Sequence, residues 1–283
     1  MVTLGLQVRP AVIADQQQIS NLILSESDVH RHLDWRAPVD WLGSKYYWVL
    51  EDARRIIAAL ACPQDPPGIA WLRLFVHASP LSGSEAWSPL WEAVCAEIQA
   101  QGGATIGVIS LYGWLQNILL ENNFQFKQNI VMLEWFNQSV ELSPLPADVT
   151  IRKMTADDLD QTVETDASAF APLWRNSYIA LQKALSLALF ATVAERDRQI
   201  IGYQISTPNS LGAHLARLTV RKETQGQGIG RALLTELLIQ VRKRRLGRLT
   251  VNTQDDNAIS LALYQKSGFL RTGEQFPVFV YEI

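Results

Sequence analysis

The 283-residue chain repeats its own pattern after a shift of 144 positions. The shift places residues of the first half on identical residues of the second, namely Val49, Glu51, Arg54, Ile56 and Ile57 on Val193, Glu195, Arg198, Ile200 and Ile201, and Arg73, Leu74 and Val76 on Arg217, Leu218 and Val220. This period is far longer than the roughly 20 to 50 residues of solenoid repeats. The pattern therefore indicates two copies of one domain, and the length suits two domains of about 140 residues each.

Two prolines, Pro144 and Pro146, mark the expected boundary between the copies, because proline removes a backbone donor and interrupts periodic structure. We expect domains at residues 1–142 and 148–283. Apolar residues make up 48% of the chain, enough for two buried cores. The sequence has no run of eighteen or more apolar residues, so we expect no membrane span.

The chemistry of the N-terminal residues and of the cysteines indicates a cytoplasmic protein. Residues 1–9 lack the basic region and the apolar region of a secretory signal. The two cysteines, Cys62 and Cys95, lack the spacing of metal ligands. We expect free thiols in a reducing compartment, and no metal site.

Each copy has the order of elements typical of an α+β domain with a mixed, mostly antiparallel sheet. The second copy predicts a strand from Ile151, a helix from Thr155 toward Ala169, and a hairpin over 189–206. The first copy repeats this order, with a hairpin over 47–61, a strand over 71–77 and a helix over 87–100.

A glycine-rich run in the second copy follows a predicted strand, 214–220, and opens a predicted helix. The run is Gln225-Gly226-Gln227-Gly228-Ile229-Gly230-Arg231. Unpaired N–H groups at a helix start attract an anion, and glycines let a diphosphate approach closely. The spacing fits neither a Walker loop nor the G-x-G-x-x-G dinucleotide fingerprint. The pattern that remains is Gln-x-x-Gly-x-Gly.

A second segment follows about thirty residues later. Residues 249–257 predict a strand and a polar turn, and 258–267 a short helix that Gly268 ends before Phe269 starts a strand. With Asn257, Tyr264 and the Gly268-Phe269 pair, this segment resembles motif B of the GCN5-related N-acetyltransferase (GNAT) superfamily, and the glycine run resembles motif A. The resemblance covers residues 150–283, and with the duplication it implies two tandem GNAT domains.

The resemblance implies an N-acetyltransferase that uses acetyl-CoA as co-substrate, with the diphosphate on the glycine run and the pantetheine arm beside the preceding strand. A primary amine would attack the thioester directly, and a backbone N–H near Leu218 would polarise its carbonyl. Tyr264 would protonate the departing thiolate, since a phenol is protonated at neutral pH. Asn257 has two possible roles, contacting the cofactor or capping the helix. The implied cofactor-binding residues are Leu218, Thr219, Val220, Gln225, Gly226, Gln227, Gly228, Ile229, Gly230, Arg231, Asn257 and Tyr264.

The sequence leaves the general base open. Thr250 and Asn252 stand where some family members have an acidic residue on a motif strand. The candidates are His214, Glu195, Asp255, Asp256 and a water molecule.

The first copy is expected to lack catalysis. At the position of the glycine run it has Ser79–Ala86, with one glycine, one proline and Glu85, whose charge would repel phosphate. Leu119 stands near the position of Tyr264. Whether this copy still binds CoA is open at this stage. The layout resembles GNATs of the mycothiol synthase type, in which an inert first domain accompanies an active second one.

Charge separates the two copies and limits the partners. Residues 1–143 carry a net charge of −6 and residues 144–283 a net charge of +3, which suits an anionic cofactor in the second copy. Arg242–Arg245 fit the negative end of a helix dipole better than a nucleic-acid surface. We expect a small-molecule amine or a protein N-terminus as acceptor, no nucleic acid and no membrane, in a monomer built as a pseudo-dimer or in a homodimer. The alternative function is a non-catalytic acyl-CoA sensor or scaffold.

Eight of the nine tryptophans lie in the first copy. Most are expected to fill its core, because large aromatic side chains bury much apolar surface. Trp35 and Trp41 lie in a loop-like stretch and are the candidates for an interface.

Overall fold

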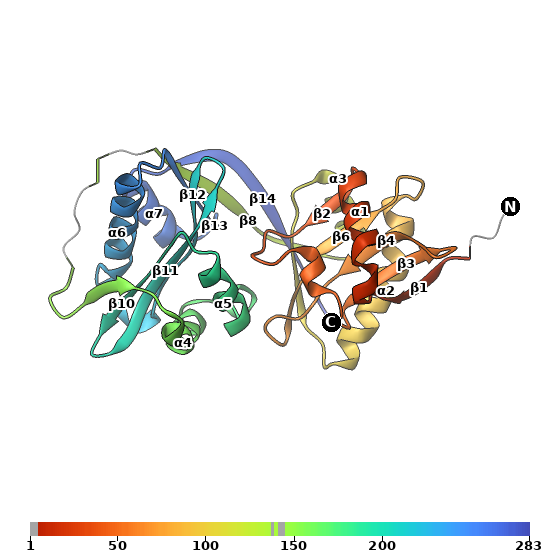
Figure 1. Cartoon of the computed structure of the whole chain (residues 1–283), viewed down its shortest axis with the longest axis horizontal. Helices are drawn as coiled ribbons and strands as arrows, with labels where there is room; N and C mark the ends of the chain where they lie inside the picture. The colour runs from red at the N-terminus through yellow and green to blue at the C-terminus, as the bar shows by residue number, and fades with distance from the viewer. Residues whose placement is uncertain (1–4, 137–138, 141–144) are drawn as a thin grey trace. The chain divides into compact units, whose positions relative to one another are not determined.

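A computed structural model describes residues 5–136, 139–140 and 145–283. These residues form two compact units (Figure 1). The first unit consists of residues 1–128 with 276–283, and the second of residues 129–275. Each unit combines a sheet with helices, as the sequence predicts for two α+β domains. Among the described residues no helix is both long enough and apolar enough to cross a membrane.

The first unit has a five-stranded sheet of order β1-β3-β4-β6-β2 and a shorter group in which β7 lies between β5 and the end of β14. The predicted strand over 71–77 is interrupted at residues 72 and 73, so that β5 pairs parallel with β7 whereas β6 pairs with β4. The strands are β1 (Gln7–Pro10), β2 (Val29–Arg31), β3 (Tyr47–Asp52), β4 (Arg55–Ala61), β5 (Ile69–Trp71), β6 (Leu74–His77) and β7 (Thr105–Ile109).

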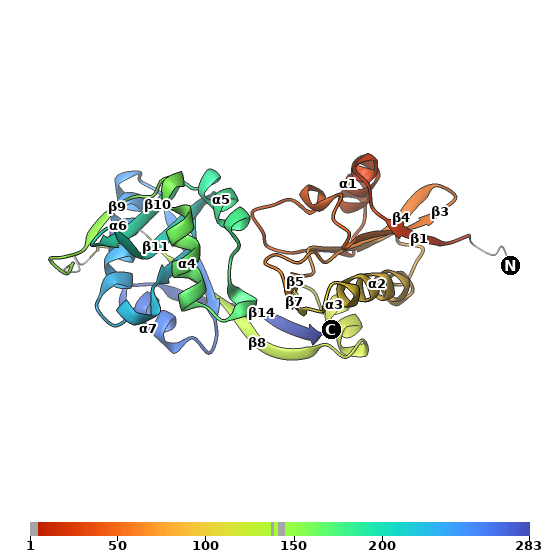
Figure 2. The same cartoon turned by 90° about the horizontal axis from the view of Figure 1, so that it is seen from below.

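Helices cover both faces of this sheet: α1 (Gln16–Ser25) lies on one face, and α2 (Gly83–Ala100) and α3 (Gly113–Glu121) lie on the other (Figure 2). Side chains of β4 alternate between the two layers, as the two-residue period of a strand requires. Ala59 and Ala61 pack in the core that contains Ile19 of α1. Ala58 and Leu60 pack in the core that contains Trp87 and Leu90 of α2. The first unit is therefore a three-layer structure.

The second unit has a sheet of order β8-β13-β12-β11-β10-β9. All neighbours are antiparallel except β12 and β13, which are parallel, so the sheet is mixed and mostly antiparallel as expected. The strands of this order are β8 (Gln125–Trp135), β9 (Thr150–Lys153), β10 (Phe190–Arg196), β11 (Gln199–Asn209), β12 (Gly212–Val220) and β13 (Arg248–Gln254). β14 (Leu270–Glu282) neighbours β8, and its end neighbours β7.

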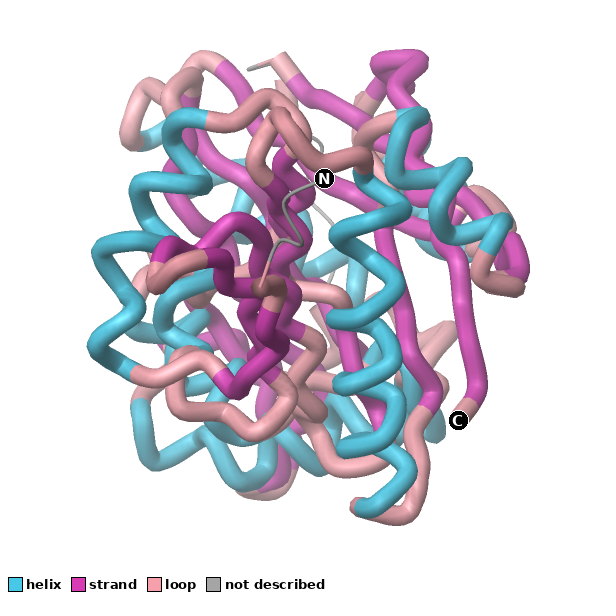
Figure 3. The backbone as a smooth tube through the Cα atoms, turned by 90° about the vertical axis from the view of Figure 1, so that its right-hand side faces the viewer, coloured by secondary structure: helices cyan, strands magenta, loops and turns pink. Residues whose placement is uncertain are grey.

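Four helices accompany this sheet: α4 (Leu159–Ala169), α5 (Tyr178–Ser186), α6 (Ile229–Lys243) and α7 (Ala258–Lys266). The apolar side of α6, with Leu234, Leu237 and Val241, packs in one core with residues of β8, β12 and β13. α4 lies against β11 and β12. Figure 3 traces the strands between flanking helices, and its C label marks the chain end directly after β14. This order places both motifs of the sequence on neighbouring elements.

The two copies exchange strands, which the sequence does not predict. Residues 130–135 of β8 end the first copy, yet they pair with β13 in the second unit. Residues 278–282 of β14 end the second copy, yet they pair with β7 in the first unit. The compact units therefore differ from the expected division at 1–142 and 148–283, because each copy donates its last strand to the other copy's sheet. Residues 143 and 144 of the expected linker lie outside the described residues.

A three-residue ion cluster occurs in both units. In the first, Arg9 Nε donates to Glu51 at 2.8 Å and its Nη1 donates to Asp15 at 2.7 Å. In the second, Arg152 binds Glu195 and Asp158 through the same atoms, both at 2.8 Å. Glu51 and Glu195 are one of the pairs that the 144-residue shift aligns. The clusters confirm the duplication at the level of side-chain geometry.

Candidate active site

One edge of β12 is open where it approaches the glycine run. β12 pairs with β11 up to Val220, whereas its pairing with β13 ends at Leu215, five residues earlier. The two strands therefore diverge beyond Leu215. Alternate residues of a strand direct their N–H and C=O groups to the same edge. Arg221 N–H bonds to Ile201 of β11, so Leu218 and Val220 present their backbone groups to the open edge.

The glycine run starts at the end of this edge. Gln225 Nε2 donates to the carbonyl of Val220 at 3.0 Å, which fixes the loop to the strand. Gly226 and Gly228 have φ values of +79° and +84°, a conformation that glycine adopts without steric cost. No described atom outside the adjacent residues lies within 4 Å of a Cβ placed on either glycine. The loop is thus an open cradle that leads into the first turn of α6.

The first turn of α6 supplies the donors expected for an anion. α6 begins at Ile229 with Gly228 as its N-cap residue. The first N–H groups of a helix have no acceptor within the helix, and the helix dipole makes this end positive. A diphosphate matches this end in both charge and hydrogen bonding, because it brings only acceptors. Gln227, Gly228, Ile229 and Gly230 lie at this helix start, and their binding of a diphosphate stays a prediction.

An arginine outside both motifs also reaches the loop. Arg196, at the end of β10, donates through Nη1 and Nη2 to Gln227 Oε1, both at 3.1 Å. Its Nε lies 2.7 Å from a carboxylate oxygen of Asp148. At the matching position, 144 residues earlier, the first copy has Asp52. Arg196 was not among the predicted site residues, although this difference between the copies was a visible signal for it.

Tyr264 lies on α7, directly beyond β13, and only 5% of it is exposed. Its ring packs 5.5 Å from the ring of Phe269, between centroids. Burial raises the pKa of Tyr264 above its ordinary value, and the charge of Arg217 on β12 opposes this rise. The phenol is therefore protonated at neutral pH, as a general acid must be, and it lies within electrostatic reach of the strand with the open edge.

Asn257 serves as the cap of α7. Its side-chain oxygen accepts from the backbone N–H of Ser260 at 3.1 Å, and its Nδ2 donates to Gln254 Oε1 at 3.4 Å. Of the two roles that the sequence left open, the structure shows the helix cap.

Two of the candidate bases are held by other residues. Glu195 belongs to the ion cluster of Arg152, whose counterpart in the first unit holds Glu51. Glu195 therefore belongs to a cluster that both copies share. Asp255 accepts from the backbone N–H and Nδ2 of Asn129, at 3.1 and 2.9 Å. Asp256 is exposed in the turn before α7.

His214 occupies a more defined environment. Its Nδ1 lies 2.9 Å from Thr250 Oγ1, and the Thr250 hydroxyl lies 3.5 Å from the carbonyl of Ala213. With the hydroxyl donating to that carbonyl, its oxygen accepts a hydrogen bond from Nδ1–H, and this tautomer leaves a lone pair on Nε2. Burial lowers the pKa of His214 to about 4, so the ring is neutral at neutral pH.

A buried network beside β12 was not predicted as part of the site. Arg217 forms a bidentate pair with Asp166 of α4, at 2.8 and 2.9 Å, and donates to the carbonyl of Trp174 at 2.7 Å. Its guanidinium carbon lies 3.4 Å from the ring centre of Phe170, and Tyr203 also donates to Asp166. The network fixes the segment after α4 against the strand that has the open edge. The match of Arg73 with Arg217 signalled an important arginine, but its partners are distant in sequence.

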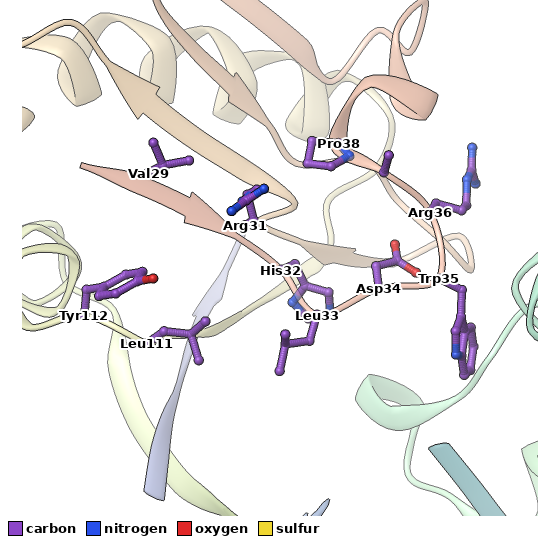
Figure 4. A pocket seen from close by; sticks show the side chains of 11 residues that line it. Val29, Arg31, His32, Leu33, Asp34, Trp35, Arg36, Pro38, Leu111 and Tyr112 are labelled. Carbon is purple, nitrogen blue, oxygen red and sulfur yellow. The ribbon is translucent and has the colours of Figure 1, made fainter. Parts of the chain in front are cut away.

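The first unit contains a cavity of about 360 Å³ beside β2, lined by Val29, Arg31, Leu33, Trp35, Leu111 and Tyr112 among others (Figure 4). Trp35 lines this cavity. Trp41, the second interface candidate, is only 7% exposed and packs in the core, with Arg36 stacked 3.4 Å above its ring. The interface prediction for Trp41 is therefore wrong, because the segment folds back onto the core.

Diverging strands beside a glycine-rich helix start, with a buried tyrosine on the next helix, define the acyl-CoA N-acyltransferase class of fold. Residues 161–278 match the acetyltransferase (GNAT) domain family. This match covers less than half of the chain and assigns a GNAT domain to the second copy, and the fold of the chain is that of two tandem GNAT domains.

Comparison with curated proteins gives three relatives. An uncharacterized N-acetyltransferase of Methanocaldococcus jannaschii is 36% identical over 87 residues, covering 31% of this chain and 55% of that protein. The mycothiol acetyltransferase of Clavibacter michiganensis is 27% identical, covering 44% of each. The [ribosomal protein bS18]-alanine N-acetyltransferase of Escherichia coli is 27% identical, covering 42% of this chain and 80% of that protein. The chain spans about half the length of the first two relatives.

Among solved structures, a tandem GNAT protein from the clavulanic acid biosynthesis pathway matches with a TM-score of 0.67 and 15% identity, over 98% of both chains. At this level of identity the match shows the fold alone. It confirms the prediction of two tandem domains.

Proposed function

We propose that the second unit transfers an acetyl group from acetyl-CoA to a primary amine, which attacks directly in a ternary complex. The match of residues 161–278 to the GNAT domain family and the names of the relatives support this activity. The observation that carries the proposal is the open edge of β12, which leads from Leu218 into the glycine cradle of Gly226 and Gly228.

The cradle and the edge suit the two parts of the cofactor. The N–H groups of Gln227 to Gly230 would hold the diphosphate at the start of α6. The pantetheine arm contains amides, and an exposed strand edge binds such groups as it binds an added strand. Leu218, Thr219 and Val220 would form this part of the site.

Two groups of the chain would then act on the thioester. The backbone N–H of Leu218 would donate to the carbonyl oxygen as negative charge develops there, an interaction worth roughly 3 kcal/mol per donor. Tyr264 would protonate the departing thiolate, and its raised pKa keeps that proton available at neutral pH.

For removal of the amine proton we propose His214 or a water molecule. Support for His214 comes from its position on β12, four residues before Leu218, and from the contact with Thr250 that orients its ring. Glu195 and Asp255 are less suitable because their carboxylates are already bound.

The proposal covers two classes of acceptor. One relative is named for mycothiol and another for an alanine of ribosomal protein bS18, so a small-molecule amine and a protein N-terminus both fit the family.

The test is release of free CoA from acetyl-CoA across a panel of small amines and N-terminal peptides. Acetyl-CoA should also raise the melting temperature, and Gly228→Trp should abolish this rise because the indole fills the cradle. Stabilisation by acetyl-CoA without turnover of any amine would instead favour a non-catalytic acyl-CoA sensor. An unchanged rise in the Gly228→Trp variant would contradict this placement of the diphosphate.

A further inference from the structure

The first unit has a strand where the second unit has an open edge. Leu74, Phe75 and Val76 of β6 correspond to Leu218, Thr219 and Val220 under the 144-residue shift. β2 pairs with these three residues, with Val29 opposite Val76 and Arg31 opposite Leu74. β6 pairs with β4 on its other side, so both of its edges are occupied. The edge that would hold a pantetheine arm is therefore filled by residues 29–31.

Further contacts hold β2 in this slot. His32 N–H donates to the carbonyl of Arg73 at 3.1 Å, and His30 Nε2 lies 3.0 Å from the carbonyl of Leu72. His30 is fully buried. Asp34, just beyond β2, lies 2.9 Å from Arg73 Nη1. β2 is thus attached by backbone, ring and ion-pair contacts to the strand segment that it covers.

The chain's own carboxylates occupy the counterpart of the anion cradle. Glu85 Oε2 accepts from the N–H and the hydroxyl of Ser82, at 2.9 and 2.7 Å, at the start of α2. Glu26 Oε2 accepts from the N–H of Ser79 at 2.9 Å. The hydrogen bonds from the hydroxyl and the backbone N–H of Ser82 lower the pKa of Glu85, which is therefore charged at neutral pH. Two negative charges stand where a diphosphate would have to bind.

We propose that the first unit is closed to CoA thioesters because its own chain fills both parts of the cofactor site, so that each chain binds one molecule. β2 replaces the pantetheine arm, and Glu26 and Glu85 replace the diphosphate. The inference rests on the proposed function of the second unit for the location of the site.

The cavity of the first unit does not expose the edge of β6 that β2 covers. Side chains of β2 itself, Val29 and Arg31, form part of its wall, together with Leu111 and Tyr112 beyond β7 (Figure 4). The cavity therefore lies beside β2, whereas the backbone groups of β6 that would bind an arm are covered by β2.

The test is the stoichiometry of acetyl-CoA binding to the full chain, measured by isothermal titration calorimetry. The wild type should bind one molecule. The matched variants Gly228→Trp and Ser82→Trp place the same side chain at the N-cap of α6 and of α2. Gly228→Trp should lose all measurable heat, and Ser82→Trp should keep a stoichiometry of one and an affinity within about twofold of the wild type.

Two molecules per chain would overturn the inference, as would residual binding by a folded Gly228→Trp variant that slows hydrogen exchange at residues 29–32 and 82–85. Residual binding that slows exchange at residues 226–231 would contradict the placement of the diphosphate instead. No binding by the wild type would count against the proposed function of the second unit and would leave the first unit closed, so the two failures are distinguishable. Hydrogen exchange gives a readout without substitutions. Acetyl-CoA should slow exchange at residues 217–220 and 226–231 and leave residues 29–32 and 82–85 unchanged; slower exchange in the latter two segments would also refute the closed first unit.

Discussion

Arg73 and Arg217 occupy the same place in the two copies, and each pairs with an aspartate and lies over an aromatic ring. Arg73 binds Asp34 and faces Trp41, whereas Arg217 binds Asp166 and faces Phe170. The aspartates come from different segments. Asp166 lies on α4, and Asp34 lies in the loop that follows β2. In the first unit this pair therefore helps to hold the strand that fills the slot.

The difference shows that two copies of one domain can share a fold and differ at one strand edge. Both units retain the ion cluster of Arg9 or Arg152 and the hairpin that follows it. What differs is the neighbour of one strand edge and the source of negative charge at one helix start. The first unit satisfies these backbone groups internally, whereas the second leaves them available to a ligand.

The largest expected difference concerns the rate of acetyl transfer. Tyr264→Phe should lower kcat by about 10² to 10⁴-fold, the usual contribution of a general acid, with little change in acetyl-CoA affinity. Leu119→Met, near the matching position of the first unit, conserves volume in its core and should leave kcat unchanged. Steady-state kinetics of CoA release would measure both. A wild-type kcat in the Tyr264→Phe variant would contradict the role of Tyr264 as general acid.

Because of the strand exchange, a substitution in the last strand of one copy should destabilise the unit that contains most of the other copy. Phe279 is 4% exposed in the core of the first unit, and Phe279→Ala should cost about 3–5 kcal/mol. Leu133→Ala should cost about 2–5 kcal/mol in the second unit, where Leu133 is fully buried. Hydrogen exchange should rise at β7 in the first variant and at β13 in the second. The opposite assignment would contradict the exchanged pairing.

Acid should weaken both units through a buried histidine. Burial lowers the pKa of His30 and of His214 to about 4, below the value of about 6.5 in the unfolded chain. As the pH falls, these histidines take up protons in the unfolded chain before they do so in the folded chain. Their contribution to the free energy of unfolding is therefore complete above about pH 6.5 and is lost as the pH falls toward 4. Urea unfolding at several pH values would measure this loss, and His30→Gln should make the free energy of unfolding depend less steeply on pH. An unaltered slope would exclude His30 as a source.

The smallest expected effects come from the two N-cap residues. Ser82→Ala should cost about 1 kcal/mol because it removes the cap of α2. Gly228→Ala should cost about 1–2 kcal/mol because it places a Cβ at a φ of +84°. Urea unfolding would give both costs, and thermal shift would give the effect on binding. We expect the stabilisation by acetyl-CoA to decrease in the Gly228 variant alone; equal decreases would show that the site depends on overall stability.

Much of the fold was predictable because its signals are local or repeated. The hairpins, the helix after the glycine run and the helix of Tyr264 follow from periodicity and turn residues within short windows. The helix cap of Asn257 was one of two stated roles. By contrast, the engagement of Glu195 by Arg152 depends on a residue 43 positions away, and its charge alone had made it a candidate base.

The sequence by itself determined that the chain holds two related α+β domains and that only the second has a glycine-rich helix start. These properties depend on residue identity within each copy. The tertiary structure decided which sheet receives β8 and β14, and that β2 covers the edge of β6. The edge of a strand can pair with any backbone that reaches it in register. The packing of the rest of the unit therefore determines which strand pairs with β6, and the three residues Val29–Arg31 alone do not.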